Sequence, residues 1–299
     1  MKRIFTVIAC AAALLTACTK PEQTTETLPA PAHKNHHASL TFSREEFANE
    51  IDNGILPITL DLTSDGHFIM CKINPADGKQ RFVVGEYTFT EVKSRTIRYD
   101  LGVEGKLEVL DPEANRWKVK FTTGSGASYD VSASVIKDRI TGSFADDLCR
   151  SWRPVTLIVS AKGGDLPASV GVAKTFKVGG DLKAIADYLY ESGVKVTVEQ
   201  VAKFNIKNIL FTEAGKVYFN FKDSSLQPYS GSYNINAGKE ENFSYNFDIS
   251  YQDNPVIPVK GDGTITFTKK QMSLYTEADV TVSGKVYRVS LTIVCEEDK

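Results

Sequence analysis

The sequence predicts an all-β protein with a few short helices, built from two tandem antiparallel modules that form barrels or sandwiches. Three observations lead to this prediction. Apolar and polar residues alternate along many short segments, as in Tyr129–Val135, which is typical of strands with one packed and one solvated face. Turn pairs such as Asp77-Gly78 and Asp262-Gly263 separate these segments. The same order of motifs also occurs twice along the chain.

Residues 1–17 have the layout of a secretory signal peptide. Lys2 and Arg3 precede an apolar run from Ile4 to Leu15, which is too short to remain as a membrane-spanning helix. The residues Leu15-Thr16-Ala17-Cys18 resemble a bacterial lipobox, in which the cysteine sulfur receives a diacylglycerol and becomes the first residue of the mature chain. We therefore expect lipid attachment at Cys18. The alternative is an ordinary signal peptide cleaved near Ala17, with Cys18 a bystander.

The anchor makes the membrane an expected partner of the protein. Each buried methylene contributes about 0.8 kcal/mol, so two or three acyl chains hold a protein on a bilayer almost permanently. By resemblance to enterobacterial sorting, Thr19 after the cysteine implies the outer membrane. Whether the protein faces the periplasm or the cell surface stays open at this point.

Residues 18–39 are expected to form a flexible tether. The stretch is rich in Pro, Thr and Glu and has almost no large apolar residue, so it cannot pack a core. As a coil, its last 21 residues reach roughly 25 Å. His33, His36 and His37 fall here, and they are either metal ligands or part of a solvated linker. Because their spacing fits no closed site, we favour the linker and expect no metal site.

Charge and cysteine content restrict the function further. Loss of Lys2 and Arg3 with the signal changes the formal net charge from −2 to −4, which argues against nucleic acid as a partner. Cys71, Cys149 and Cys295 remain beside Cys10 and Cys18, too few for a disulfide framework. Cys295 is either a buried thiol, which we favour, or a partner of Cys149.

Module 1 is predicted to span residues 40–145. It opens with Ser43-Arg44-Glu45-Glu46, a capping box that predicts a short helix with Phe47 and Ile51 turned inward. A hairpin over residues 62–68 follows, with Gly66 at its turn. The later motifs are Gly85-x-Tyr87, Tyr99 twelve residues after Tyr87, and Ser125-Gly126 followed by Tyr129, Val131 and Ser132.

Module 2 is predicted to span residues 146–299 and repeats these motifs in order. Its equivalents are the capping box Thr197–Gln200, the hairpin 211–217, Gly231-x-Tyr233, Tyr245, and Ser283-Gly284 followed by Tyr287, Val289 and Ser290. An insertion over about residues 181–205 predicts two helices, the first with Leu182, Ile185 and Leu189 on one stripe. This insertion either caps a barrel mouth or packs on the outside.

The start of module 2 carries a family resemblance. Leu148-Cys149-Arg150-Ser151-Trp152, the strand Pro154–Val159 and the later Gly-x-Tyr hairpins resemble lipocalin-like (calycin) domains of Gram-negative lipoproteins. The resemblance covers roughly residues 146–295 directly and residues 40–145 through the repeat. It implies a β-barrel in which Trp152 closes the base, a structural role. Arg150 stands where true lipocalins have a Gly, and this departure bears on ligand binding more than on architecture.

No catalytic motif is present. The sequence has no phosphate-binding loop, no nucleophile elbow and no zinc-protease motif. Outside the tether the one histidine is His67, at a hairpin turn, and Asp61 and Asp65 lack the dense acidic loop of a calcium site. We therefore expect no enzyme, no catalytic residue and no cofactor.

Aromatic residues give the remaining hint of function. Several crowd one stretch of module 2, namely Tyr218, Tyr229, Tyr233, Tyr245, Phe247 and Tyr251. They either line a pocket or, as we favour, belong to the core and strand surfaces. The expected function is a lipid-anchored envelope lipoprotein that binds a small hydrophobic ligand or a protein partner, at residues the sequence does not identify. The alternative is a structural or adhesin-like surface component without a pocket.

Overall fold

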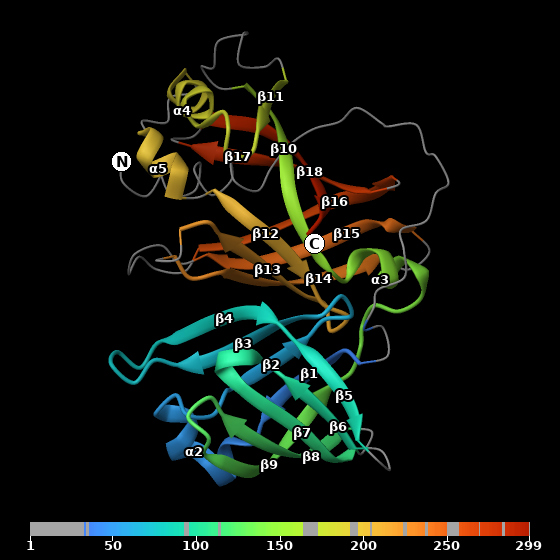
Figure 1. The fold of residues 1–299 in the computed structure, drawn as a ribbon. Coiled ribbons are helices and arrows are strands. Elements are labelled where there is room, and N and C mark those ends of the chain that lie inside the picture. Colours follow the sequence, from blue (N-terminus) through green and yellow to red (C-terminus); the bar gives the residue numbers. More distant parts are fainter. Residues whose placement is uncertain are drawn as a thin grey trace. The chain divides into compact units, whose positions relative to one another are not determined.

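A computed structural model describes residue 33 and residues 36–92, 96–112, 115–163, 173–191, 197–203, 205–223, 226–236, 239–249, 257–268, 270–282 and 285–298. Cys18 and the predicted signal peptide lie outside these residues. The fold is mostly antiparallel β, with two curled sheets and a few short helices, which confirms the predicted class (Figure 1).

The chain divides into two compact units. The N-terminal unit comprises Ala30–Arg150 together with Phe211–Gly215, and the C-terminal unit holds Ser151–Leu210 and Lys216–Lys299. Module 2 was predicted to begin at residue 146, five residues before Ser151, where the C-terminal unit begins. No described helix is long and apolar enough to cross a membrane.

The first sheet has nine strands in the order β4-β3-β2-β1-β9-β8-β7-β6-β5. The elements are β1 (Ala38–Phe42), α2 (Arg44–Asp52), β2 (Thr59–Leu62), β3 (His67–Ile73), β4 (Gln80–Glu86), β5 (Thr88–Val92), β6 (Thr96–Asp100), the 3₁₀ helix η1 (Gly102–Glu104), β7 (Gly105–Pro112), β8 (Arg116–Thr123), β9 (Ser128–Ile136) and α3 (Ser143–Leu148). The two end strands, β4 and β5, follow one another directly at Tyr87. The sheet therefore curls until the chain itself joins its two edges.

The second sheet has the order β11-β10-β12-β13-β14-β15-β16-β17-β18, and β18 also pairs with β10 and closes a ring. The elements are β10 (Ser151–Gly163), β11 (Lys174–Lys177), α4 (Leu182–Glu191), α5 (Val198–Lys203), β12 (Ile206–Phe211), β13 (Lys216–Phe221), β14 (Tyr229–Asn236), β15 (Lys239–Ile249), β16 (Ile257–Thr268), β17 (Gln271–Val282) and β18 (Lys285–Glu297).

The two sheets share the topology that the internal repeat predicts. In each, the strands form an up-and-down meander whose first strand pairs with its last, β1 with β9 and β10 with β18. The glycine motif also occupies equivalent registers, since Gly85 pairs with Phe68 and Gly231 pairs with Val217. A Cβ atom at Gly85 would lie 2.7 Å from the Phe68 ring, which explains the glycine.

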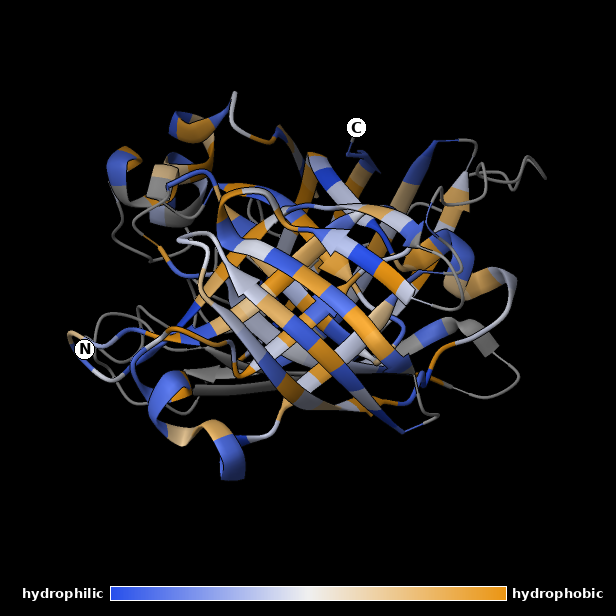
Figure 2. Ribbon diagram, turned by 60° about the horizontal axis from the view of Figure 1, so that its bottom comes forward, coloured by the Kyte–Doolittle hydropathy of each residue, from blue (hydrophilic) through white to orange (hydrophobic). Residues whose placement is uncertain are grey.

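Apolar side chains from successive strands fill the first sheet's interior. Leu40, Leu60, Tyr99, Leu107 and Phe121 are all at most 1% exposed and belong to one core cluster. Their neighbours along each strand turn outward, and Figure 2 shows the resulting alternation of hydrophobic and hydrophilic residues. Among the described residues, packed apolar side chains thus occupy the inward positions of this barrel.

Helix α2 differs in one respect from the prediction. Ser43 is its N-cap residue but makes no side-chain cap bond. Its N–H, which Glu46 would accept in a capping box, instead donates to Ser132 O at 2.9 Å. The capping-box prediction is therefore wrong at this position. Ile51 is buried and Phe47 packs on the core, as predicted.

Helix α4 packs on the inward-facing side of β10. Its Ile185 and Tyr188 belong to a cluster with Val159 and Ala161, and Val159 pairs with the buried Leu291. Paired residues of antiparallel strands share a face, so the helix lies against the inner surface. This favours the capping alternative. The side chain of Leu189 lies outside the described residues.

The cysteine and tryptophan predictions are resolved. Cys149 and Cys295 are both buried thiols and lie in different units, and burial raises the pKa of Cys295. Trp152 is fully buried on β10, 5.9 Å from the Phe267 ring. Its role is that of a core residue, as the resemblance implied.

Candidate functional site

The candidate site is a surface notch in the C-terminal unit where β10 changes partners. On one edge, β10 pairs with β12 through Ser151 and Trp152, and with β11 from Thr156 onward. Residues 153–155, between these two pairings, are paired with neither β11 nor β12. Pro154 lies in this interval and has no N–H to leave unpaired.

A β-bulge shapes the floor of the notch. The register of β10 with β18 shifts between Pro154 and Thr156, so one extra residue is accommodated and the strand bends. The carbonyl of that residue, Val155, accepts a hydrogen bond from Val178 N at 3.1 Å. This bond ties the chain after β11 to the bulge.

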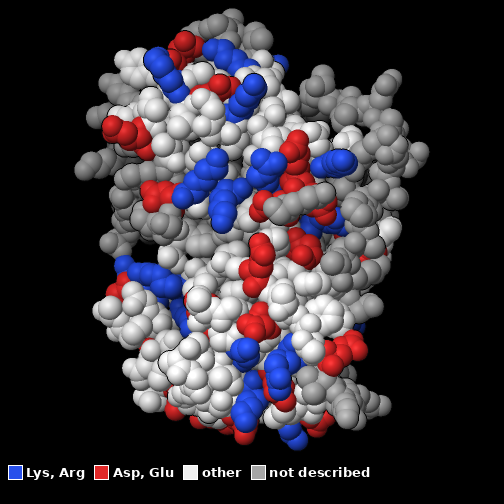
Figure 3. Space-filling model, viewed as in Figure 1, with Lys and Arg blue, Asp and Glu red and all other residues white. Residues whose placement is uncertain are grey.

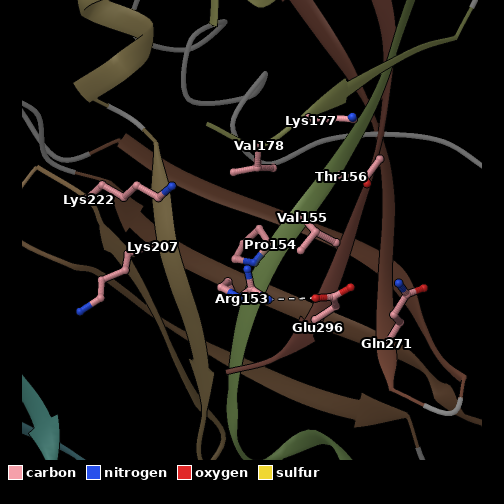
Figure 4. Close-up of a pocket in the computed structure, with 10 residues that line it drawn as sticks. All are labelled: Arg153, Pro154, Val155, Thr156, Lys177, Val178, Lys207, Lys222, Gln271 and Glu296. Carbon is pink, nitrogen blue, oxygen red and sulfur yellow. Dashed lines mark hydrogen bonds and ion pairs between the residues drawn. The ribbon is translucent and has the colours of Figure 1, made fainter. Parts of the chain in front are cut away.

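The notch has a volume of about 460 Å³. Its lining consists of Arg153, Pro154, Val155, Thr156, Lys177, Val178, Lys207, Lys222, Gln271 and Glu296. Figure 4 shows Lys207 and Lys222 on one side of β10 and Gln271 and Glu296 on the other. Figure 3 shows Lys and Arg side chains gathered over β10 and the start of β12.

The lining carries a net positive charge. Arg153 pairs with Glu296 at 2.9 Å, so this one carboxylate is engaged. Lys177, Lys207 and Lys222 make no ion pair with any described residue. Three ammonium groups that form no ion pair among the described residues therefore border one small depression.

A glycine lets one of these ammonium groups and a side-chain amide lie close to the backbone. Gly179 has φ +79°, and a Cβ atom there would lie 2.9 Å from Lys222 Nζ and 3.1 Å from Asn205 Nδ2. Asn205 also accepts at its carbonyl from Lys222 N at 2.8 Å. Its side-chain Oδ1 is buried and has no hydrogen-bond partner among the described residues. The corner formed by Gly179, Asn205 and Lys222 thus contains one buried hydrogen-bond acceptor, Asn205 Oδ1, without a donor among the described residues.

The residues that the sequence singled out do not form a site of this kind. Tyr218 and Tyr233 lie on opposite faces of the sheet, because Tyr218 pairs with Ser230 and Val217 with Gly231. The side chains of Tyr245 and Phe247, and all of Tyr251, lie outside the described residues. A single aromatic pocket is therefore not supported by the described part of this group.

The candidate acidic and histidine positions are also placed. Asp65 accepts from Thr63 Oγ1 at 2.6 Å, and its other oxygen lies 3.1 Å from His67 Nδ1. Within the described residues, no group of three or more His, Cys, Asp or Glu is arranged to hold a metal ion. His33, His36 and His37 contact the N-terminal unit, although we expected them in the solvated linker. The predicted tether also ends earlier than expected, since Ala38 and Ser39 belong to β1.

Sequence reasoning missed the notch because its cations lie far apart along the chain. Arg153, Lys177, Lys207 and Lys222 come from four different segments. The one local signal was Pro154 inside a strand, which marks an edge or a bulge.

Comparisons with known proteins add little. No protein-family model matches the chain, and no curated protein matches it. Among solved structures, a protein of unknown function of the DUF3598 family from Nostoc punctiforme PCC 73102 is 10% identical. The alignment covers 88% of this chain and 94% of that one, with a TM-score of 0.19. At this score the likeness supports no argument about fold or function.

Proposed function

We propose that the protein is a non-catalytic, lipid-anchored binding module of the cell envelope, and that its ligand is a small molecule carrying a phosphate or sulfate group. The observation that carries the ligand class is the notch, where three lysine ammonium groups form no ion pair with the part of the chain that the structure describes. Lysine acts as a compact point charge toward oxyanions. A volume of about 460 Å³ leaves room for more than the anionic group itself.

The described interior of the first barrel does not favour an apolar ligand. Its inward positions are occupied by packed side chains, so we assign this unit a supporting role. Binding is instead assigned to the outer surface of the C-terminal unit, where charged and backbone groups are available to a polar ligand.

Anion binding is tested by calorimetric titration of inorganic phosphate and a sugar phosphate into the full mature chain at low salt. Gly179→Ala places a methyl group against Lys222 and Asn205, and we expect at least tenfold weaker binding. Gly180→Ala is the matched control, because a Cβ atom there meets Lys177 only at ordinary contact distance, 3.5 Å.

The outcomes are separable. The notch is supported as the binding site if the wild-type and Gly180→Ala chains bind phosphate equally and the Gly179→Ala chain binds it more weakly. Equal binding by all three chains, or no binding by the wild type, contradicts it.

The lipid anchor has its own test. Cys18→Ala removes the sulfur that would carry the acyl chains, so the mature protein is expected to leave the membrane fraction almost completely. Membrane fractionation followed by immunoblotting measures this. Continued retention of Cys18→Ala in washed membranes would refute the anchor and leave the ligand proposal untouched.

A further inference from the structure

Three histidines before β1 pack against the N-terminal unit. The backbone N–H of His33 donates to Ser64 O at 2.8 Å, and the N–H of His36 donates to His33 O at 2.8 Å. His37 then leads directly into β1. We call His33, His36 and His37 together the histidine clasp.

The rings of the clasp rest on aromatic side chains. The His33 ring lies 4.9 Å from Tyr87 and 5.1 Å from Phe89, and His36 stacks on Phe89 at 3.6 Å. At Gly66 a Cβ atom would lie 2.8 Å from His33 Cε1. The turn between β2 and β3 therefore admits the His33 ring only because residue 66 is a glycine.

The docked rings fit the neutral form of histidine. Nδ1 of His33 and Nδ1 of His36 are both buried and have no hydrogen-bond partner among the described residues. A neutral imidazole needs only one donor satisfied, whereas a protonated ring has two N–H donors. Protonation would thus bury an unsatisfied charged N–H group, which is costly.

The surrounding charges set the direction of the pH effect. Burial lowers the pKa of His33, while Asp65 acts in the opposite direction and His36 and His67 reinforce the lowering. Because the pKa is lower in the docked state, His33 favours docking fully above about pH 6.5 and loses this contribution as the pH falls. Glu91 lies 3.6 Å from His36 Nε2 and is exposed, so it opposes the effect weakly.

His37 faces two carboxylates. Its Nε2 lies 3.0 Å from Asp138 and its Nδ1 lies 4.0 Å from Glu213. Burial raises the pKa of Glu213 to about 7, against the opposing effect of His37, so this carboxylate loses its charge on mild acidification. The remaining pair with Asp138 is partly exposed and holds the clasp weakly.

We propose that the histidine clasp is a pH-sensitive latch, in which the segment before β1 is docked on Tyr87 and Phe89 at neutral pH and is released by mild acid. Docking fixes the point at which the linker to the membrane anchor begins. Release lengthens that linker and uncovers the aromatic surface of the barrel.

Hydrogen–deuterium exchange of the full mature chain tests the latch. After correction for intrinsic rates, peptides covering residues 33–37 are expected to lose at least tenfold of their protection between pH 7.5 and pH 5.5. Peptides from β8 should keep theirs. In His33→Gln/His36→Gln the amides cannot take up a proton, so most of the pH dependence should disappear and only the part due to Glu213 should remain. The control His37→Gln should retain most of the wild-type pH dependence.

Two results would overturn the proposal. One is wild-type protection of residues 33–37 that is equal at both pH values. The other is the same loss of protection in His33→Gln/His36→Gln as in the wild type. Should the double variant be unprotected throughout, NMR titration of the wild-type His33 imidazole decides, since the latch requires His33 to titrate below pH 6.5.

Discussion

Trp152→Ala is expected to lower the free energy of unfolding of the C-terminal unit by about 3–5 kcal/mol, the usual cost of removing a buried aromatic side chain. The indole is fully buried and tilted against Phe267. Trp152 also pairs with Ile209 of β12 and with Glu297 of β18, so the cavity would open where three strands meet.

Urea denaturation followed by circular dichroism measures the effect of this substitution. Trp152→Phe is the matched control, because it keeps an aromatic ring at the same position, and it should lose less than half as much stability. A loss below about 1 kcal/mol for Trp152→Ala would show that the indole does not support the barrel.

Charge reversal in the notch is expected to have the largest effect on binding. Lys177→Glu/Lys222→Glu replaces two ammonium groups, neither in an ion pair with a described residue, with carboxylates that repel an oxyanion. At the few-ångström distances of the notch, and with the screening of a protein surface, we expect phosphate affinity to fall roughly 100-fold or more.

A matched control separates the notch from general charge. Lys174 of β11 pairs with Glu191 of α4, and Lys183 pairs with Asp187 within α4. Neither lysine lines the notch. Lys174→Glu/Lys183→Glu changes the net charge equally, so it should reduce affinity only by long-range screening, about twofold. Equal losses in the two double variants would mean that phosphate responds to overall charge alone.

Much of the fold was predictable from local pattern. The alternation along Tyr129–Val135 and the turns at Gly66 and Gly215 depend on residues close in sequence. The internal repeat then predicted the same order of hairpins in both modules. The capping box at Ser43 failed because its backbone joins β9 through Ser132, a long-range contact that no local motif records.

The candidate site was harder to predict for the same reason. Lys177, Lys207 and Lys222 meet only because β10 exchanges β12 for β11 at Pro154. The histidine clasp likewise depends on Phe89 and Tyr87, about fifty residues away in sequence. Composition alone predicted a solvated linker at His33, His36 and His37.

The central claim is that the notch binds an oxyanion, and mapping amide chemical shifts during a phosphate titration of the isotope-labelled mature chain tests it most directly. The notch proposal predicts saturable shifts confined to the amides of residues 153, 155, 156, 177–179, 205–207 and 222. Absence of saturable shifts, or shifts spread over the lysine-bearing surface as a whole, would contradict it.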